Sequence, residues 1–248
     1  MVSNKAELEK SNQALMDFTY IASHDLQEPL RKMITFGGYL NSNYSQSLDE
    51  KGIDYLKRIQ KSGLRMQAFI EDLLKLSRTS IKPINTNLNS LNAVISNVLS
   101  ELELSIKEKQ GKVICDPLPK IQSDRLQMQQ LFQNLLSNAL KFQVKGKPPI
   151  INISSKKVES GSWQILIQDN GIGIDPVHAE RIFQPFERLH GRSTYEGTGI
   201  GLAICQKIMA RHHGTITLKS ELGKGSCFIL TFPESQPEEN ETDVLYEF

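Results

Sequence analysis

Four short stretches in the second half of the chain carry residue types that could hold a nucleotide. In the helical sequence Gln130–Phe142, three polar residues recur at i, i+4 and i+7 and therefore share one helix face: Asn134, Asn138 and Lys141. Amide oxygens are hard, neutral ligands that suit Mg²⁺, and a lysine one turn further on can meet a phosphate as a point charge. Taken alone, the same spacing fits a solvated helix face at least as well.

Two glycine-rich stretches follow. Asp169 stands at the end of a strand pattern, where its carboxylate can accept a hydrogen bond from the exocyclic amine of adenine, and Gly171 and Gly173 permit close backbone approach. Further on, Gly197–Leu202 (GTGIGL) precedes a helix, so backbone N–H groups and the helix dipole could bind a triphosphate. It is neither a P-loop nor a dinucleotide fingerprint. Each stretch by itself could be a plain glycine-rich turn.

The fourth stretch lies between these two. Gln184–Glu196 (QPFERLHGRSTYE) is polar and carries Arg188 and Arg192. A mobile segment of this kind can close over a bound nucleotide as a lid. A long surface loop would have the same composition.

Composition limits the cellular setting and the partners. The chain has 248 residues, with 29 Lys and Arg against 28 Asp and Glu, and three widely spaced cysteines without a C-x-x-C pair. This balance provides no global field that would attract nucleic acid or a membrane surface, and the cysteines do not suggest a disulfide framework. The apolar runs are far shorter than the roughly 18–20 residues that span a bilayer, and the N-terminus has no signal-peptide core. We therefore expect a cytoplasmic chain that contacts neither nucleic acid nor membrane.

Residues 1–80 predict two long antiparallel helices. Apolar or small residues recur in the second helix at spacings of 4 and 3: Ile59, Gly63, Met66, Ile70, Leu73 and Ser77. Tyr44–Gly52 is the polar break, with Ser47 as the expected N-cap and Glu50 completing a capping box. One hairpin cannot enclose its own apolar stripe, so the sequence predicts a homodimeric four-helix bundle. The alternative is a monomeric hairpin that packs on the rest of the chain.

Residues 85–233 predict a second domain, an α+β sandwich with helices on one face of a mostly antiparallel sheet. The expected helices are Leu91–Lys109, Ser123–Phe142, the short Glu180–Phe183 and Gly199–His213, and the expected strands are Lys112–Cys115, Ile150–Val158, Trp163–Gln168, Thr215–Ser220 and Cys227–Phe232. Residues 234–248 are acidic and are expected to form a flexible tail.

The order of the four stretches is more specific than any one of them. Asn134–Phe142, Asp169–Ile174, Ile182–Leu189 (IFQPFERL) and Gly197–Leu202 resemble the N, G1, F and G2 boxes of the Bergerat-type ATP-binding domain. Sensor histidine kinases, Hsp90, MutL and type II topoisomerases share that domain. Phe18–Leu30 (FTYIASHDLQEPL) resembles the H-box of dimeric histidine kinases. Its sequence is most similar to that of kinases attached to PAS, GAF or phytochrome-type sensors.

The resemblance implies a role for each matching residue. His24 would be the phosphoacceptor, and Asp25 its orienting acid. Asn138 would ligate Mg²⁺, Asp169 would recognise adenine, and Arg188 would reach the γ-phosphate. The residues that the resemblance places around ATP are Asn134, Asn138, Lys141, Asp169, Gly171, Gly173, Arg188, Gly197, Thr198, Gly199, Gly201 and Leu202.

The function implied is that of a sensor histidine kinase transmitter, which autophosphorylates on His24 with ATP and Mg²⁺ and then phosphorylates an aspartate of a response regulator receiver domain. An upstream sensory domain is expected outside this chain. The alternative is a dimeric docking module that binds nucleotide without turnover, but the presence of His24, Asn138 and Asp169 together favours the enzyme. One departure is Glu28, since many family members carry Thr or Asn four residues after the histidine. A carboxylate there would repel phosphoaspartate, which predicts weak phosphatase activity.

Overall fold

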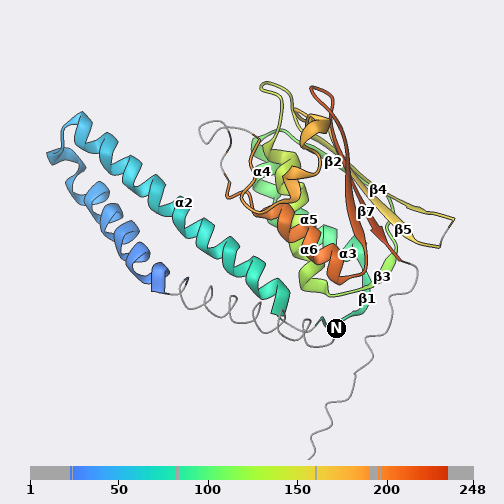
Figure 1. Cartoon of the computed structure of the whole chain (residues 1–248). Helices are drawn as coiled ribbons and strands as arrows, with labels where there is room; N and C mark the ends of the chain where they lie inside the picture. The colour runs from blue at the N-terminus through green and yellow to red at the C-terminus, as the bar shows by residue number, and fades with distance from the viewer. Residues whose placement is uncertain are drawn as a thin grey trace, which may run out of the picture. The chain divides into compact units, whose positions relative to one another are not determined.

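The computed structural model describes residues 23, 25–81, 84–159, 161–189, 195 and 197–233 (Figure 1). It divides into two compact units. The first joins the described residues up to 81 with Glu180–Lys207, and the second joins Ile84–Ala179 with the described residues from Ile208 onward. His24 and the expected acidic tail lie outside the described residues, and the predicted domain boundaries at residues 80 and 85 remain a prediction.

Two antiparallel helices form a hairpin in the first unit (Figure 1). Residues 25–44 are helical, the short 3-10 turn η1 (Ser45–Ser47) follows, and α2 runs over Glu50–Ile81. Asp49 caps α2, because its Oδ1 accepts the backbone N–H of Gly52 at 2.7 Å. The expectation of Ser47 as the N-cap is therefore wrong: Ser47 belongs to η1, and the carboxylate next to the helix start is the acceptor.

Apolar side chains on successive turns of the two helices pack against each other inside the hairpin. Its apolar cluster consists of Leu30, Ile34, Ile70 and Leu74. Gly63 permits the close approach of the helices, since a Cβ there would lie 2.9 Å from Ile34 Cγ1. The expected single stripe on α2 is divided, however, because Ile59 and Met66 are 59% and 52% exposed. α2 thus has one apolar face inside the hairpin and a second one beside it that is exposed.

The second unit is built on a five-stranded sheet in the order β2-β4-β5-β7-β6. The strands are β2 (Lys112–Cys115), β4 (Ile150–Lys157), β5 (Trp163–Asp169), β6 (Thr215–Glu221) and β7 (Gly225–Phe232). β2 pairs with β4 in parallel, and the other neighbours are antiparallel. A separate antiparallel pair joins β1 (Asn87–Ser90) to β3 (Lys120–Ser123).

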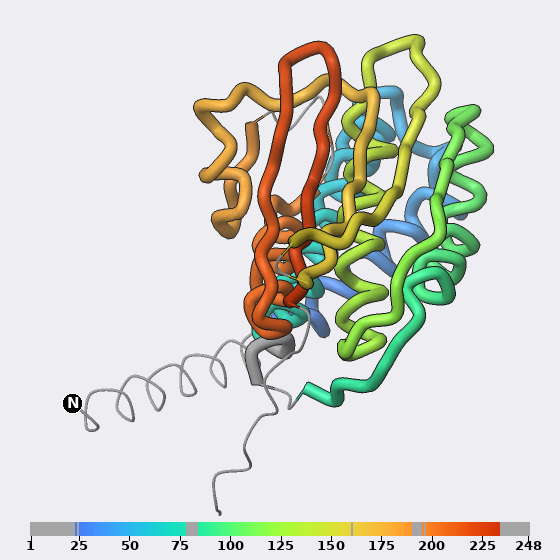
Figure 2. The backbone as a smooth tube through the Cα atoms, turned by 90° about the vertical axis from the view of Figure 1, so that its right-hand side faces the viewer, coloured from blue at the N-terminus to red at the C-terminus, as the bar shows by residue number. Residues whose placement is uncertain are grey.

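Helices cover one face of this sheet (Figures 1 and 2). They include α3 (Leu91–Glu101), α4 (Glu103–Glu108) and α5 (Arg125–Lys141). The expected helix over Leu91–Lys109 is interrupted at Leu102, whose φ of −93° and ψ of 1° leave the helical region. Fully buried side chains such as Phe132 and Ile165 fill the space between α5 and the sheet.

The remaining elements are short or join the two units. η2 (Pro176–His178) and η3 (Arg181–Phe183) follow the sheet strand β5, and α6 spans Gly201–Arg211, so the division between the units falls within this helix. None of the helices within the described ranges combines the length and the low charge that a bilayer crossing requires.

Candidate functional site

One face of α5 carries the first group of predicted site residues. The helix is anchored at its start, where the Asp124 side chain accepts two backbone N–H groups of the first turn at 3.0 Å. Asn134, Asn138 and Lys141 are half-buried, while the apolar stripe beside them is buried in the core. The Lys141 ammonium lies 4.4 Å from the centroid of the Phe142 ring, which holds the charge at the C-terminal end of α5.

Asp169 is the last residue of β5, and the two oxygens of its carboxylate have different hydrogen-bond partners. Its Oδ1 accepts the backbone N–H of Gly171 at 2.8 Å and that of Ser226 at 3.3 Å. Burial raises the pKa of the Asp169 carboxyl, and the two backbone hydrogen bonds act in the opposite direction. Oδ2 takes part in neither bond. The side chain is therefore fixed through one oxygen and has a second one to offer to a hydrogen-bond donor.

The loop after Asp169 needs glycine because backbone atoms come too close for any side chain. A Cβ on Gly171 would lie 2.2 Å from the carbonyl oxygen of Phe142, and a Cβ on Gly173, whose φ is +70°, would lie 2.0 Å from that of Glu221. The N–H of Ile172 donates to the Phe142 carbonyl at 3.0 Å. These contacts place the carboxylate loop against the end of α5, so the structure brings two of the four predicted stretches together.

Asn170 was not singled out in the sequence, yet it secures the same loop. Its Oδ1 accepts the N–H of Ile150 at 2.8 Å, and its Nδ2 donates to the carbonyl of Pro148 at 3.0 Å. The side chain thus joins the loop to the start of β4. An Asn directly before a glycine in a turn is the signal that could have found it.

The other two stretches lie together in the first unit. The Arg188 guanidinium donates to the carbonyls of Tyr195 and Gly197, both at 2.6 Å, and the N–H of Phe186 donates to the carbonyl of Gly199 at 3.0 Å. Gly199 has a φ of +77°. These hydrogen bonds fasten Arg188 to the glycine-rich stretch, and the γ-phosphate contact that the resemblance implies for Arg188 stays a prediction.

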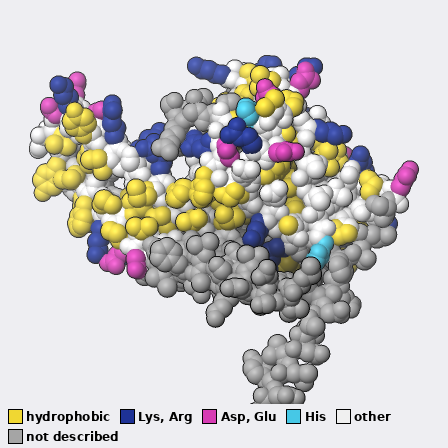
Figure 3. Space-filling model, in the orientation of Figure 1, with side chains coloured by type: hydrophobic (Ala, Val, Ile, Leu, Met, Phe, Trp, Pro, Cys, Tyr) yellow, Lys and Arg dark blue, Asp and Glu magenta, His cyan; other side chains and the backbone are white. Residues whose placement is uncertain are grey.

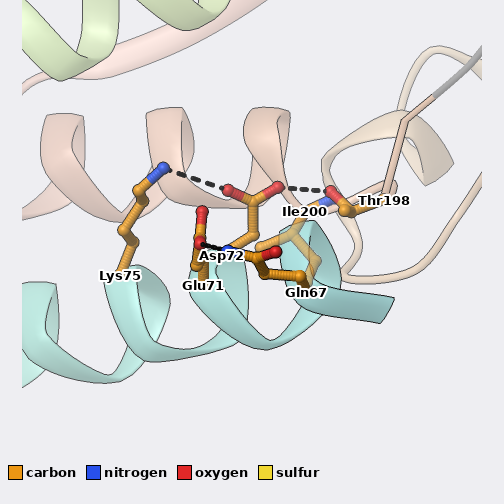
Figure 4. Close-up of polar contacts among 6 residues, drawn as sticks. All are labelled: Gln67, Glu71, Asp72, Lys75, Thr198 and Ile200. Carbon is orange, nitrogen blue, oxygen red and sulfur yellow. Dashed lines mark hydrogen bonds and ion pairs between the residues drawn. The ribbon is translucent and has the colours of Figure 1, made fainter. Parts of the chain in front are cut away.

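Thr198, within that stretch, contacts α2 (Figure 4). Its Oγ1 donates to Asp72 Oδ2 at 2.7 Å and accepts the N–H of Ile200 at 3.3 Å. A second contact joins the same segments, since the rings of Phe69 and Phe186 lie 5.5 Å apart between centroids. The predicted residues Gly201 and Leu202, both half-buried, form the first turn of α6.

Comparison with known proteins assigns both regions to families. Residues 14–80 match the His Kinase A (phospho-acceptor) domain, and residues 123–236 match the histidine kinase-, DNA gyrase B- and HSP90-like ATPases. The chain belongs to the sensor histidine kinases. The resemblance seen in the sequence is thereby confirmed, and so is the expected fold of this kinase, a helical hairpin followed by a mixed sheet with helices.

Individual relatives agree with this assignment. The kinase is 39% identical over 227 residues to cyanobacterial phytochrome A of Nostoc sp., a match that covers 92% of this chain and 29% of that protein. The structure of full-length ShkA in complex with AMPPNP has a TM-score of 0.68 at 22% identity, over 88% of this chain and 45% of that chain. The structure of histidine kinase ThkA in complex with response regulator TrrA has a TM-score of 0.62 at 22% identity, over 94% and 67%. The first curated relatives are much longer than this kinase, which spans 29–30% of their length.

The residues around the predicted phosphoacceptor are helical in this kinase. Ser23 is buried and Asp25 is exposed, on either side of His24, which the structure does not describe. One turn later the Glu28 carboxylate accepts a hydrogen bond from Lys32 Nζ at 2.7 Å. The negative charge expected at this position is therefore paired on the exposed surface.

Proposed function

We propose that this kinase transfers the γ-phosphoryl group of ATP to His24 and then to an aspartate of a response regulator. The observation that carries the proposal is the arrangement of Asp169, a half-buried carboxylate held through Oδ1 by two backbone N–H groups beside a glycine loop. Such a carboxylate offers Oδ2 as a fixed acceptor for the 6-amino group of adenine. Gly171 and Gly173 hold the loop beside this carboxylate in close backbone contact with Phe142 and Glu221, where any side chain would collide with a carbonyl oxygen.

Each unit of the chain has groups that suit phosphate binding. Lys141 supplies a positive charge at the end of α5, and Gly197–Leu202 ends in the first turn of α6, where backbone N–H groups favour an anion. Within the described residues no cluster of three or more His, Cys, Asp or Glu could hold a metal. Mg²⁺ would therefore depend on the amide oxygen of Asn138, with Asn134 one turn away, and on phosphate and water oxygens, which suits its preference. When bound, the ion would neutralise charge on the phosphates.

The protein has little covalent work to do in this transfer. Positioning and charge neutralisation carry most of the catalysis of phosphoryl transfer. His24 would present one imidazole nitrogen to the γ-phosphorus, while Asp25 would hold the opposite ring N–H and so select the attacking nitrogen. The P–O bond to the β,γ-bridging oxygen breaks as the N–P bond forms, and ADP leaves.

The exposed face of the hairpin supports a homodimer. Its large apolar side chains are Leu26, Met33, Phe36, Tyr39, Leu40, Tyr44, Tyr55, Ile59, Leu64, Met66 and Phe69, each at least 38% exposed. On α2, Tyr55, Ile59, Met66 and Phe69 recur at spacings of 4, 7 and 3, which is the period of a helix seam. Figure 3 shows hydrophobic side chains gathered along the hairpin. A second copy with the same face would complete a four-helix bundle.

The partners follow from the reaction and from the relatives. ThkA was solved in complex with a response regulator, TrrA, and a receiver domain is the acceptor that we propose here. Because this chain spans 29–30% of the first curated relatives, we also propose a sensory domain upstream of the hairpin. A cytoplasmic setting, where ATP is present, fits the reaction.

Incubation with γ-³²P-ATP and Mg²⁺ tests the proposal. We expect label that is stable to alkali and labile to acid, as in a phosphohistidine, and that is lost in His24→Gln and in Asp169→Ala. His213→Asn, which alters an exposed histidine elsewhere, should keep it. ATP binding without any label in the wild-type chain would instead support a docking module without turnover.

A further inference from the structure

Two serines on neighbouring strands connect the two ends of the loop over residues 169–174. Ser220 on β6 and Ser226 on β7 are direct partners in the antiparallel pair. The N–H of Ser226 donates to Asp169 Oδ1 at 3.3 Å, at the start of the loop. At the other end, the N–H of Ile174 donates to Ser220 Oγ at 2.8 Å. The serine pair therefore bridges the beginning and the end of the loop that carries the adenine-binding carboxylate.

The surrounding atoms determine the direction of each hydrogen bond. Ser220 Oγ lies 2.9 Å from the carbonyl oxygen of Gly225 and 2.9 Å from Ser226 Oγ. A carbonyl only accepts, so the single proton of Ser220 goes to Gly225, and Ser226 donates to Ser220. Ser220 Oγ then accepts two hydrogen bonds and donates one. Its full bonding capacity is used in holding the loop and the strand end against each other.

Backbone atoms of the loop over residues 169–174 also lie close to the turn between β6 and β7. A Cβ on Gly225, whose φ is +111°, would lie 2.0 Å from the carbonyl oxygen of Asp169. The N–H of Gly223, in the turn between β6 and β7, donates to the carbonyl of Ile172 at 2.7 Å. Ser226 is 7% exposed. Loss of the Ser220 hydroxyl would leave the half-buried Ile174 N–H without this acceptor and would loosen the end of the loop.

We propose that Ser220 is a positioning residue that sets the selectivity of this kinase for adenine. Ser220 acts through Asp169, because Ser220 fixes the loop over residues 169–174 and Asp169 is the first residue of that loop. The inference rests on the proposed function, in which Asp169 Oδ2 accepts the 6-amino group of the base. Inosine triphosphate (ITP) has a carbonyl oxygen in place of that amine, so the ratio of ITP to ATP dissociation constants measures how well the carboxylate is placed.

The test compares three single variants of the full chain by the Kd of ATP and of ITP. Ser220→Ala should lower the selectivity ratio about three- to tenfold, the effect of one lost hydrogen bond. Thr217→Ala, which removes an exposed hydroxyl from the same strand, should leave the ratio unchanged. Ser220→Thr keeps the hydroxyl and should restore most of the selectivity. A lower melting temperature of Ser220→Ala with an unchanged ratio would show a merely structural role and overturn the inference.

A second background separates this inference from the function on which it rests. In Asp169→Ala the ratio should be low, and adding Ser220→Ala should not lower it further, since the side chain that Ser220 positions is gone. If Asp169→Ala lowers the ratio while Ser220→Ala behaves like Thr217→Ala, only the role of Ser220 is refuted. If the wild-type chain does not prefer ATP, or Asp169→Ala leaves the ratio unchanged, adenine recognition by Asp169 is refuted as well.

Discussion

The hydroxyl of Thr198 donates a 2.7 Å hydrogen bond to the carboxylate of Asp72, 126 residues earlier in the chain. Thr198 lies in the glycine-rich stretch that we assign to phosphate binding, and its single proton cannot go to Asp72 and to a phosphate oxygen together. A carboxylate beside this stretch also repels an anion. The Phe69–Phe186 ring contact holds the same two segments together. Contact with α2 and phosphate binding are therefore expected to compete.

Asp72→Ala should accordingly strengthen ATP binding. We expect the Kd of ATP to fall about two- to fivefold, since one competing hydrogen bond to a charged group disappears. Isothermal titration calorimetry measures the change. Glu71→Ala is the matched control, because Glu71 is the neighbouring carboxylate on α2 and bonds to Gln67 instead of to the glycine-rich stretch (Figure 4). Equal effects of the two substitutions would contradict competition at Thr198.

Acid should weaken the adenine selectivity of the wild-type chain. Burial raises the pKa of Asp169, so the carboxyl takes up its proton at a higher pH than an ordinary aspartate. Protonation converts an acceptor for the adenine amine into a possible donor, so the preference for ATP over ITP should fall as the pH is lowered from neutral towards the raised pKa of Asp169. Titration of the phosphates cancels in this ratio, because both nucleotides carry the same triphosphate. A ratio that falls equally in Asp169→Asn would contradict the assignment.

His212 should make folding stability depend on pH. It is fully buried; its Nε2 accepts the N–H of Asp124 at 3.0 Å, and its Nδ1 lies 2.8 Å from the carbonyl oxygen of Ile208. These partners require the neutral ring with its proton on Nδ1. Burial lowers the pKa of His212 below 6.5, against a smaller opposing effect of the Ile208 and Asp124 contacts, while Arg211 and His213 lower it further.

The sign of this dependence follows from the lowered pKa. Below pH 6.5 the unfolded chain gains a proton that the folded chain resists, so the stabilisation is complete above 6.5 and is lost as the pH falls towards the folded-state pKa. His212→Leu should lower the unfolding free energy by about 1–3 kcal/mol at neutral pH and flatten this dependence. Urea titrations between about pH 5 and about pH 8 give both quantities. His213→Asn, at the exposed neighbour, should retain the slope.

A charge on the exposed face of the hairpin should prevent association. Ile59 is 59% exposed in the single chain, and burial of this remaining surface against a second copy would contribute about 1–2 kcal/mol per copy. Ile59→Asp should therefore weaken the dimer at least tenfold without loss of helical circular dichroism. Sedimentation equilibrium measures the association. Lys57→Asp, on an exposed polar position of α2, serves as the control, and a wild-type chain that is monomeric at high concentration would refute the dimer.

Glu28 should limit dephosphorylation of the response regulator. Its ion pair with Lys32 joins side chains that are 60% and 61% exposed, and such surface pairs are weak and screened. Enough negative charge remains to repel a phosphoaspartate. Glu28→Thr should raise the rate at which phosphorylated regulator loses its label about tenfold or more, as expected when about 1.4 kcal/mol of repulsion is removed. A rapid wild-type rate would contradict this prediction.

The helices and strands are easier to predict from the sequence than the side-chain hydrogen bonds that join them. The helix α5 and the strands β4 and β5 follow from apolar spacing, which is a local property of the chain. The sequence predicts the cap of α2 at Ser47 instead of Asp49, because both residue types suit an N-cap and only the position of the helix start distinguishes them. The Ser220–Ile174 bond joins positions 46 residues apart, and no periodic pattern encodes such a pairing.

The division of the hairpin into a closed face and an exposed face has an evolutionary consequence. The residues that hold the two helices of one chain together, such as Leu30 and Ile70, are separate from those that another chain would contact, such as Phe36 and Ile59. Substitutions at the second set can change which paralogue is accepted without unfolding the first. Related kinases in one cell can in this way become insulated from one another while each retains an intact scaffold.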